Sequence, residues 1–138
     1  MANSEVQVMD MKLDDRVELV PGHVYRKTIG TDCMGVTMFW MNRPSDPEVS
    51  LIPFHKHGEE MFYCLKGKGI IKVDGVPHVI QEGDTMLIPA GAEHGGVFET
   101  DELIILCVES PPRPELRFYF NDITKEGAPL IPPGESIG

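Results

Sequence analysis

The sequence is short of basic residues and of long apolar runs, and each shortage excludes a class of function. Its 138 residues contain 12 Lys and Arg against 22 Asp and Glu, which gives a formal net charge of −10. A chain this acidic repels nucleic-acid phosphates and anionic lipid surfaces, so we expect no nucleic-acid partner. No run approaches the roughly 20 apolar residues of a membrane-spanning helix, and the acidic first residues are unlike a secretory signal. We therefore expect no membrane association.

Cysteine is also scarce. The three cysteines, Cys33, Cys64 and Cys107, are odd in number and widely separated in the chain. Scattered cysteines of this kind are typical of a reducing compartment, so we expect free thiols and a cytoplasmic location. Cys64 shares the alternation of Glu60 and Phe62 and is a candidate for a pocket wall, although a small buried hydrophobic side chain is its more ordinary role.

Segments with helical periodicity are missing, and short strand-like runs separated by turn residues take their place. These runs are rich in β-branched and aromatic residues, which favours an all-β fold. The pair Asp74-Gly75 is a strong signal for a two-residue hairpin turn. We expect strands at 17–20, 24–29, 36–41, from 51 through the histidines that follow, and at 61–65, 70–73, 76–80, 85–88, 103–108 and 116–120.

Two imidazoles and a carboxylate lie together at the start of one of these strands. His55 and His57 are two positions apart, so they point to the same face of a strand. Glu60 follows after the short Gly58-Glu59 link, which can fold its carboxylate back towards both rings. His94 stands after a Pro-x-Gly turn that ends the strand 85–88, and it is the candidate for a fourth ligand.

Three imidazoles and one carboxylate are a ligand set for a divalent transition metal. Fe, Mn, Ni, Co, Cu and Zn all suit such a site, whereas Ca and Mg prefer oxygen ligands. We therefore predict one such metal, of unknown identity.

The two stretches resemble the two sequence motifs of the cupin family, a group of small β-barrel proteins. Two residues separate His57 from Glu60, where the family has three or four, which makes Glu59 a second candidate. Phe98 stands where the second motif ends in Asn. The first motif is matched at His55, His57, Glu60 and Gly67, and the second at Gly83, Pro89, Gly91 and His94.

The resemblance implies an antiparallel β-sandwich closed into a jelly-roll barrel, with the metal inside one end. It also implies a homodimer, commonly formed by exchange of terminal strands. Hydrophobic residues make up 41% of the chain, which fits one domain over 1–138. Within it we expect a core barrel at 35–110, an N-terminal arm at 1–16 and an irregular tail at 121–138.

The side chains that could line the cavity predict a partly apolar pocket. A pocket of this kind suits a small oxygenated organic molecule better than a sugar with many hydroxyl groups. Trp40 could instead be a packing anchor of the core. The candidate lining residues are Met38, Trp40, Phe62, Cys64 and Phe98.

The ligand set predicts a metal-dependent enzyme that binds its small-molecule substrate at open coordination positions. We place a mononuclear dioxygenase ahead of an isomerase or lyase, because no general base beyond the ligands is evident. One alternative is a non-catalytic cupin that binds a small ligand. Another is a barrel that keeps the sequence pattern for packing and holds no metal.

Overall fold

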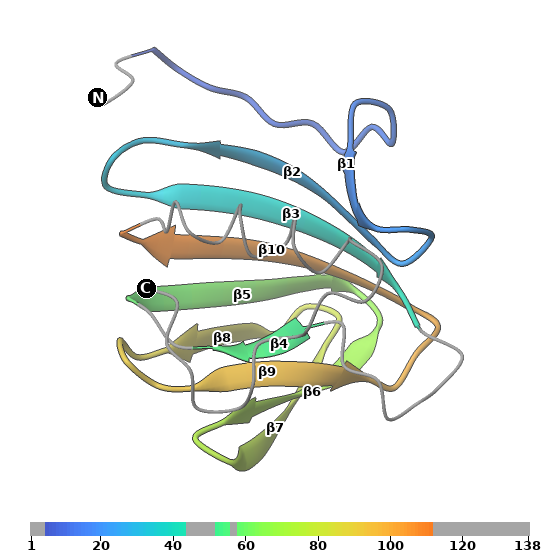
Figure 1. The fold of residues 1–138 in the computed structure, drawn as a ribbon, viewed down its shortest axis with the longest axis vertical. Helices are drawn as coiled ribbons and strands as arrows, with labels where there is room; N and C mark the ends of the chain where they lie inside the picture. The colour runs from blue at the N-terminus through green and yellow to red at the C-terminus, as the bar shows by residue number, and fades with distance from the viewer. Residues whose placement is uncertain (1–4, 44–51, 56–57, 112–138) are drawn as a thin grey trace.

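The structure is a computed structural model that describes residues 5–43, 52–55 and 58–111 (Figure 1). These residues form ten β-strands and no helix. No helix of the described part is long and apolar enough to cross a membrane. The strands are β1 (Val17–Val20), β2 (Val24–Gly30), β3 (Gly35–Asn42), β4 (Ile52–His55), β5 (Glu59–Lys66), β6 (Lys68–Val73), β7 (Val76–Gln81), β8 (Thr85–Ile88), β9 (His94–Phe98) and β10 (Glu102–Ser110).

The strands form two antiparallel sheets, which confirms the predicted all-β fold. One sheet has six strands in the order β1-β2-β3-β10-β5-β8, and the other has four in the order β4-β9-β6-β7. Figure 1 shows the larger sheet running from β1 at the top to β5 and β8, with the smaller sheet below it. Strands distant in sequence become neighbours, because β10 lies between β3 and β5.

The main core lies between the two sheets. Its buried residues include Ile71 and Ile80 from the smaller sheet together with residues from the larger one. Alternate positions of β5 and β10 face this core, as expected for strands with one face buried. The buried members are Val24, Met41, Phe62, Cys64, Ile71, Ile80, Ile88, Ala92, Leu103, Ile105 and Cys107.

A second cluster packs on the opposite face of the larger sheet. It contains Met38, Trp40 and Ile104, with Met9 and Tyr25 packed against it. Successive side chains of a strand point to opposite faces, so Met38 and Trp40 lie across β3 from the core residue Met41. The structure therefore places these two predicted pocket residues in a buried cluster separate from the core between the sheets, where Trp40 has a packing role.

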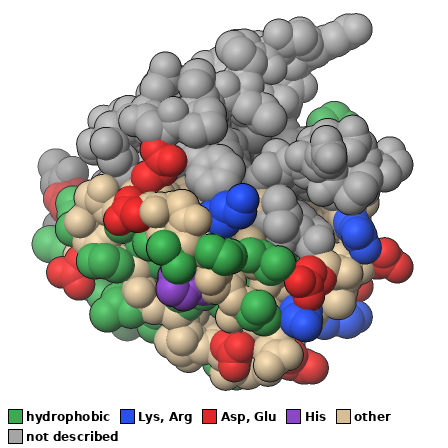
Figure 2. Space-filling view, turned by 90° about the horizontal axis from the view of Figure 1, so that it is seen from below, with side chains coloured by type: hydrophobic (Ala, Val, Ile, Leu, Met, Phe, Trp, Pro, Cys, Tyr) green, Lys and Arg blue, Asp and Glu red, His purple; other side chains and the backbone are tan. Residues whose placement is uncertain are grey.

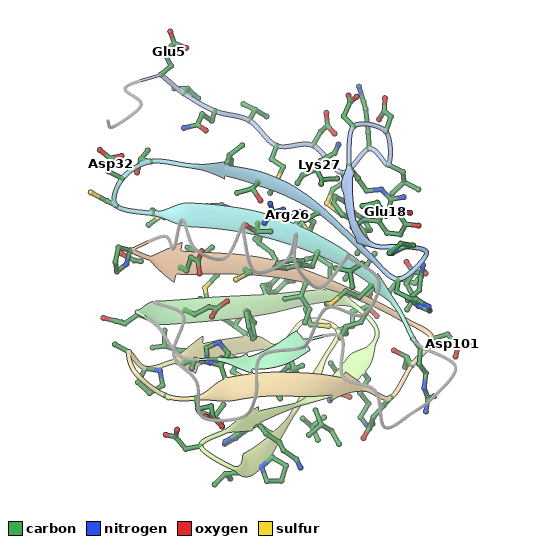
Figure 3. The ribbon with its side chains drawn as sticks, viewed as in Figure 1. Glu5, Glu18, Arg26, Lys27, Asp32 and Asp101 are labelled. Atoms are coloured by element: carbon green, nitrogen blue, oxygen red, sulfur yellow. The ribbon has the colours of Figure 1, made fainter. Side chains whose placement is uncertain are left out.

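Residues 5–16 run beside β2 of the same chain. The Gln7 side chain donates a hydrogen bond to the Gly30 carbonyl and accepts one from the Gly30 N–H. The ammonium of Lys27, a residue labelled in Figure 3, donates a hydrogen bond to the Asp10 carboxylate at 2.7 Å. This hydrogen bond holds the pKa of Asp10 below its usual value. The predicted N-terminal arm thus contacts its own sheet.

The Arg16 guanidinium covers the aromatic part of the second cluster. It lies 4.3 Å from the centre of the Tyr25 ring and 5.4 Å from that of Trp40. Stacking of a cation on an aromatic face is favourable, so this contact ties the end of the arm to the sheet.

The described strands agree closely with the predicted ones, with one exception. The sequence reading did not predict β9, whose residues Gly95 and Gly96 favour a turn over a strand. The Asp74-Gly75 hairpin is confirmed, and both residues have positive φ, at 47° and 81°, as a type I′ turn requires. The predicted strand at 116–120 and the tail at 121–138 lie outside the described residues.

Gly67 joins β5 to β6, and its place in the motif has a steric reason. Its φ is +89°, and a Cβ there would collide with the carbonyl oxygen of Glu102. Only glycine fits this turn without moving the start of β10.

β7 is an edge strand of the smaller sheet. Val76 and Val79 on this strand are exposed. Figure 2 shows hydrophobic side chains gathered on the face of the molecule seen from below.

Candidate metal centre

The residues of the site come from strand ends that meet at one end of the two sheets. Glu60 is the second residue of β5, and His94 is the first residue of β9. The backbone of His55, the last residue of β4, pairs with that of His94. His57 and the side chain of His55 lie outside the described residues, so their roles as ligands stay predictions.

Glu60 and His94 are in direct contact in the interior. Their side chains are 4% and 1% exposed, and His94 Nε2 lies 2.7 Å from Glu60 Oε2. Residues 34 positions apart in sequence are thereby joined. Two of the four predicted ligands therefore lie side by side, as one shared site requires.

The other ring nitrogen of His94 shows which tautomer is present. Nδ1 lies 3.0 Å from the carbonyl oxygen of Ala92, which can only accept a hydrogen bond, so Nδ1 carries a proton. In a neutral ring, Nε2 then presents a lone pair to the Glu60 carboxylate. Two such acceptors in contact need a positive charge between them, either a proton or a metal ion. A backbone carbonyl on Nδ1 is also the usual support of a metal-binding histidine.

The hairpin β6–β7 holds the turn that carries His94. The Asp74 N–H donates to the Glu93 carbonyl at 2.7 Å, and the Glu93 N–H donates to Asp74 Oδ1 at 2.9 Å. Within the turn, the Ala92 N–H donates to the Pro89 carbonyl. The backbone just before His94 is thus held both by the β6–β7 hairpin and by its own turn. These contacts orient the His94 ring.

Glu60 has further neighbours on the inner face of the sheet. The Cys107 thiol donates a hydrogen bond to Glu60 Oε1. The Phe62 ring meets the His94 ring edge to face, with centroids 6.0 Å apart and planes at 71°. The carboxylate and the imidazole are therefore enclosed by an aromatic ring and a buried thiol.

Glu109 is a buried acid that the sequence reading missed. It is 7% exposed, and in the pairing of β10 with β5 it lies directly opposite Glu60. Residues opposite each other in an antiparallel pair share a face, so both carboxylates point inwards. The predicted strand ended at 108, two residues before the end of β10, and so left Glu109 out. Extending the alternation of Ile105 and Cys107 by one step would have found Glu109.

The remaining predicted pocket residues separate into two groups. Phe62 and Cys64 lie on the same inner face as Glu60. The Cys64 thiol hydrogen-bonds to the carbonyls of Lys66 and Gly67, and burial raises its pKa. The backbone of Phe98 pairs with that of Gly69 on β6, and its side chain lies outside the described residues.

The described residues fit part of a metal site. No group of three or more His, Cys, Asp or Glu side chains in the described part is arranged to hold a metal ion. Glu60 and His94 do have the donor atoms, the burial and the second hydrogen bond expected of two ligands of a borderline metal. The pair is thus half of the predicted ligand set.

Fold and site together define a class: small antiparallel two-sheet proteins with a histidine and a carboxylate inside one end. A family model for the cupin domain matches residues 45–109. This match and the fold support a cupin family protein.

Solved structures agree with this fold. An RmlC-like cupin from Shewanella frigidimarina superposes with a TM-score of 0.65 at 20% identity, over 81% of this chain and 96% of that one. KdgF from Halomonas sp. superposes with a TM-score of 0.59 at 23% identity, over 74% of this chain and 90% of that one. At such identities the likeness concerns the fold alone.

Two curated relatives match shorter stretches. The dimethylsulfoniopropionate lyase DddW of Ruegeria pomeroyi is 50% identical over 44 residues, which are 31% of this chain and 29% of that protein. An uncharacterized protein of Methanocaldococcus jannaschii is 37% identical over 65 residues, 42% of this chain and 49% of that one. The chain spans less than half the length of either relative.

Proposed function

We propose that this cupin is a metal-dependent enzyme that acts on a small oxygenated organic compound. The predicted ligands are His55, His57, Glu60 and His94, and the observation that carries the proposal is the buried contact between Glu60 and His94. A bound metal would polarise a substrate carboxylate, enol or hydroxyl group, or activate O₂ if it is iron.

Backbone and side-chain groups of this chain would orient the metal ligands and shield the site from water. The Ala92 carbonyl holds the proton of His94 on Nδ1 and so directs Nε2 towards Glu60. Phe62 covers the imidazole, and an apolar wall of this kind would keep bulk water from a bound substrate. Such an interior favours a compact substrate with one or two polar groups.

Two reaction classes stay open, and different observations favour them. The predicted ligand set alone favours a dioxygenase. The similarity of a 44-residue segment to a dimethylsulfoniopropionate lyase favours a lyase. A lyase also needs a group that accepts a proton from the substrate, and the buried Glu109 adds a carboxylate to the inner face.

The first experiment measures the metal content of the purified protein before and after metal is added back. We expect about one transition-metal ion per chain, and none in the double variant His55→Ala/His57→Ala. His78→Ala is the matched control, because His78 is an exposed histidine of β7 outside the motifs. A parent that stays metal-free after addition would contradict the proposal.

The loaded protein is then tested for oxygen consumption with small carboxylic acids and for elimination from dimethylsulfoniopropionate. Oxygen uptake that depends on substrate supports the dioxygenase, and formation of an alkene product without oxygen uptake supports the lyase. A protein that binds metal and ligand but turns over none of these compounds would favour the alternative of a ligand-binding cupin. Titration of ligand binding by calorimetry separates that case from an inert barrel.

A further inference from the structure

We propose that Cys107 is a positioning residue that holds the Glu60 carboxylate so that Oε2 alone is presented to the metal. The inference rests on the metal-dependent function proposed above. It assigns a role to a thiol that does not belong to either sequence motif.

The contact is built by the larger sheet. Cys107 of β10 pairs with Phe62 of β5, and Glu60 is two residues from Phe62 and therefore shares its face. Thiol and carboxylate thus meet diagonally across two neighbouring strands. Both are 4% exposed, so neither group exchanges this contact freely with water.

The two oxygens of Glu60 have different partners. Oε1 accepts a hydrogen bond from the Cys107 thiol, and Oε2 lies 2.7 Å from His94 Nε2. A carboxylate can bind a metal through one oxygen or through both. Because the thiol engages Oε1, it favours binding through Oε2 only.

The number of oxygens that Glu60 provides affects what the site can do. Binding through one oxygen leaves a further coordination position for water or substrate, and catalytic metal sites need an open position. Hydrogen bonds that orient a ligand commonly change metal affinity by about 10- to 100-fold. A thiol is a weak donor, but in a buried site a weak hydrogen bond is strengthened by the low local dielectric constant.

The chain offers a matched control in Cys64. This thiol is also buried on the inner face, but it donates to the backbone carbonyls of Lys66 and Gly67, whereas the Cys107 thiol donates to the Glu60 carboxylate. Replacing it removes a buried thiol of the same size from the same core. Only Cys107 should affect the metal.

The test compares the parent with Cys107→Ala, Cys107→Ser and Cys64→Ala. Each protein is titrated with Co²⁺ against a chelator, and the visible absorption of bound Co²⁺ is recorded. Circular dichroism confirms that each variant is folded. We expect Cys107→Ala to bind Co²⁺ about 10- to 100-fold more weakly and with a changed spectrum. Cys107→Ser retains a donor and should recover part of the affinity, whereas Cys64→Ala should match the parent.

Three outcomes would overturn the inference. A folded Cys107→Ala with the parent's affinity and spectrum shows that the thiol does not position Glu60. Equal losses in Cys107→Ala and Cys64→Ala show a general effect of core packing. A parent that binds no Co²⁺, Fe²⁺ or Zn²⁺ overturns both the metal centre and this inference. A parent that binds metal as tightly as Cys107→Ala overturns the role of Cys107 alone.

Discussion

Glu60 and Glu59 are neighbouring carboxylates with different surroundings. Glu60 is buried against His94, whereas Glu59 is exposed at the start of β5. The shortened link after His57 made both of them candidates. The structure therefore favours Glu60 as the ligand, and the two residues form a natural pair of test and control.

We predict that Glu60→Gln lowers metal affinity by at least about 100-fold, because it removes a charged donor from the metal itself. The measurement is a competition titration with a chelator. Glu59→Gln should leave the affinity within about twofold of the parent. The reverse result, with Glu59→Gln losing the metal, would mean that Glu60 is not the ligand.

The three cysteines differ in accessibility. Cys33 is exposed, whereas Cys64 and Cys107 are buried. Burial also raises the pKa of the Cys64 thiol, so it stays protonated to higher pH, and the protonated form does not react with thiol reagents. We predict that one thiol per chain reacts rapidly at neutral pH and that the other two react only after unfolding.

A time course with a chromogenic disulfide reagent, with and without denaturant, checks this prediction. Cys33→Ser should remove the rapid phase and leave the slow one. A rapid phase that persists in Cys33→Ser would show that a core thiol reaches solvent.

At the scale of elements, the β6–β7 hairpin supports the histidine of a different strand. Asp74 at the tip of this hairpin makes two hydrogen bonds to the backbone of Glu93. Its φ of 47° is also unfavourable for most residues, although Asp and Asn tolerate it. The residue therefore serves both the turn and the placement of His94.

We predict that Asp74→Ala lowers the free energy of unfolding by about 1 to 3 kcal/mol, since it loses a hydrogen bond and adds backbone strain. It should also weaken metal binding, because the backbone next to His94 is released. Asp74→Asn keeps the side-chain oxygen and should retain most of both properties.

Asp84→Ala is the control for this prediction. Its carboxylate accepts a hydrogen bond from the Gln81 N–H within another turn and does not hold Glu93. This variant should lose stability without losing metal affinity. If Asp74→Ala and Asp84→Ala lose metal affinity equally, the effect of Asp74→Ala comes from the lost stability of the fold and not from the placement of His94.

At the scale of the whole molecule, a metal that binds the folded chain and not the unfolded chain must stabilise the fold. At a free concentration 100 times the dissociation constant the gain is about 2.7 kcal/mol, which for a domain of this size raises the melting temperature by roughly 10 °C. Differential scanning fluorimetry with and without metal measures the shift. The His55→Ala/His57→Ala variant should show none, and an equal shift in that variant would place the metal elsewhere.

We also predict a homodimer, on the basis of the resemblance to cupins. Light scattering after size exclusion should give twice the chain mass of 15.4 kDa. In the single chain, residues 5–16 contact their own β2, so a dimer that exchanges the arm would form the Gln7–Gly30 and Asp10–Lys27 contacts between subunits. A monomer mass over a hundredfold range of concentration would contradict the prediction.

Local patterns predicted most of the described strands, but they missed β9, in which two glycines interrupt the alternation of polar and apolar side chains. β9 begins at His94 and continues through Gly95 and Gly96, which carry no side chains to show alternation. Its place in the sheet comes from pairing with β4 and β6 on either side. The sequence therefore indicated the residue His94 and the turn before it, but not the strand to which it belongs.

The sequence by itself determined the turns, most of the strands and the identity of the candidate ligands, since each depends on residues close together in the chain. The tertiary structure decided which faces these strands bury: it turned Met38 and Trp40 away from the core and brought Cys107 and Glu109 to the face of Glu60. The physical reason is that side chains alternate along a strand, so the register between β3, β10 and β5 assigns each residue to a face. That register is a contact between segments distant in sequence, which no local pattern contains.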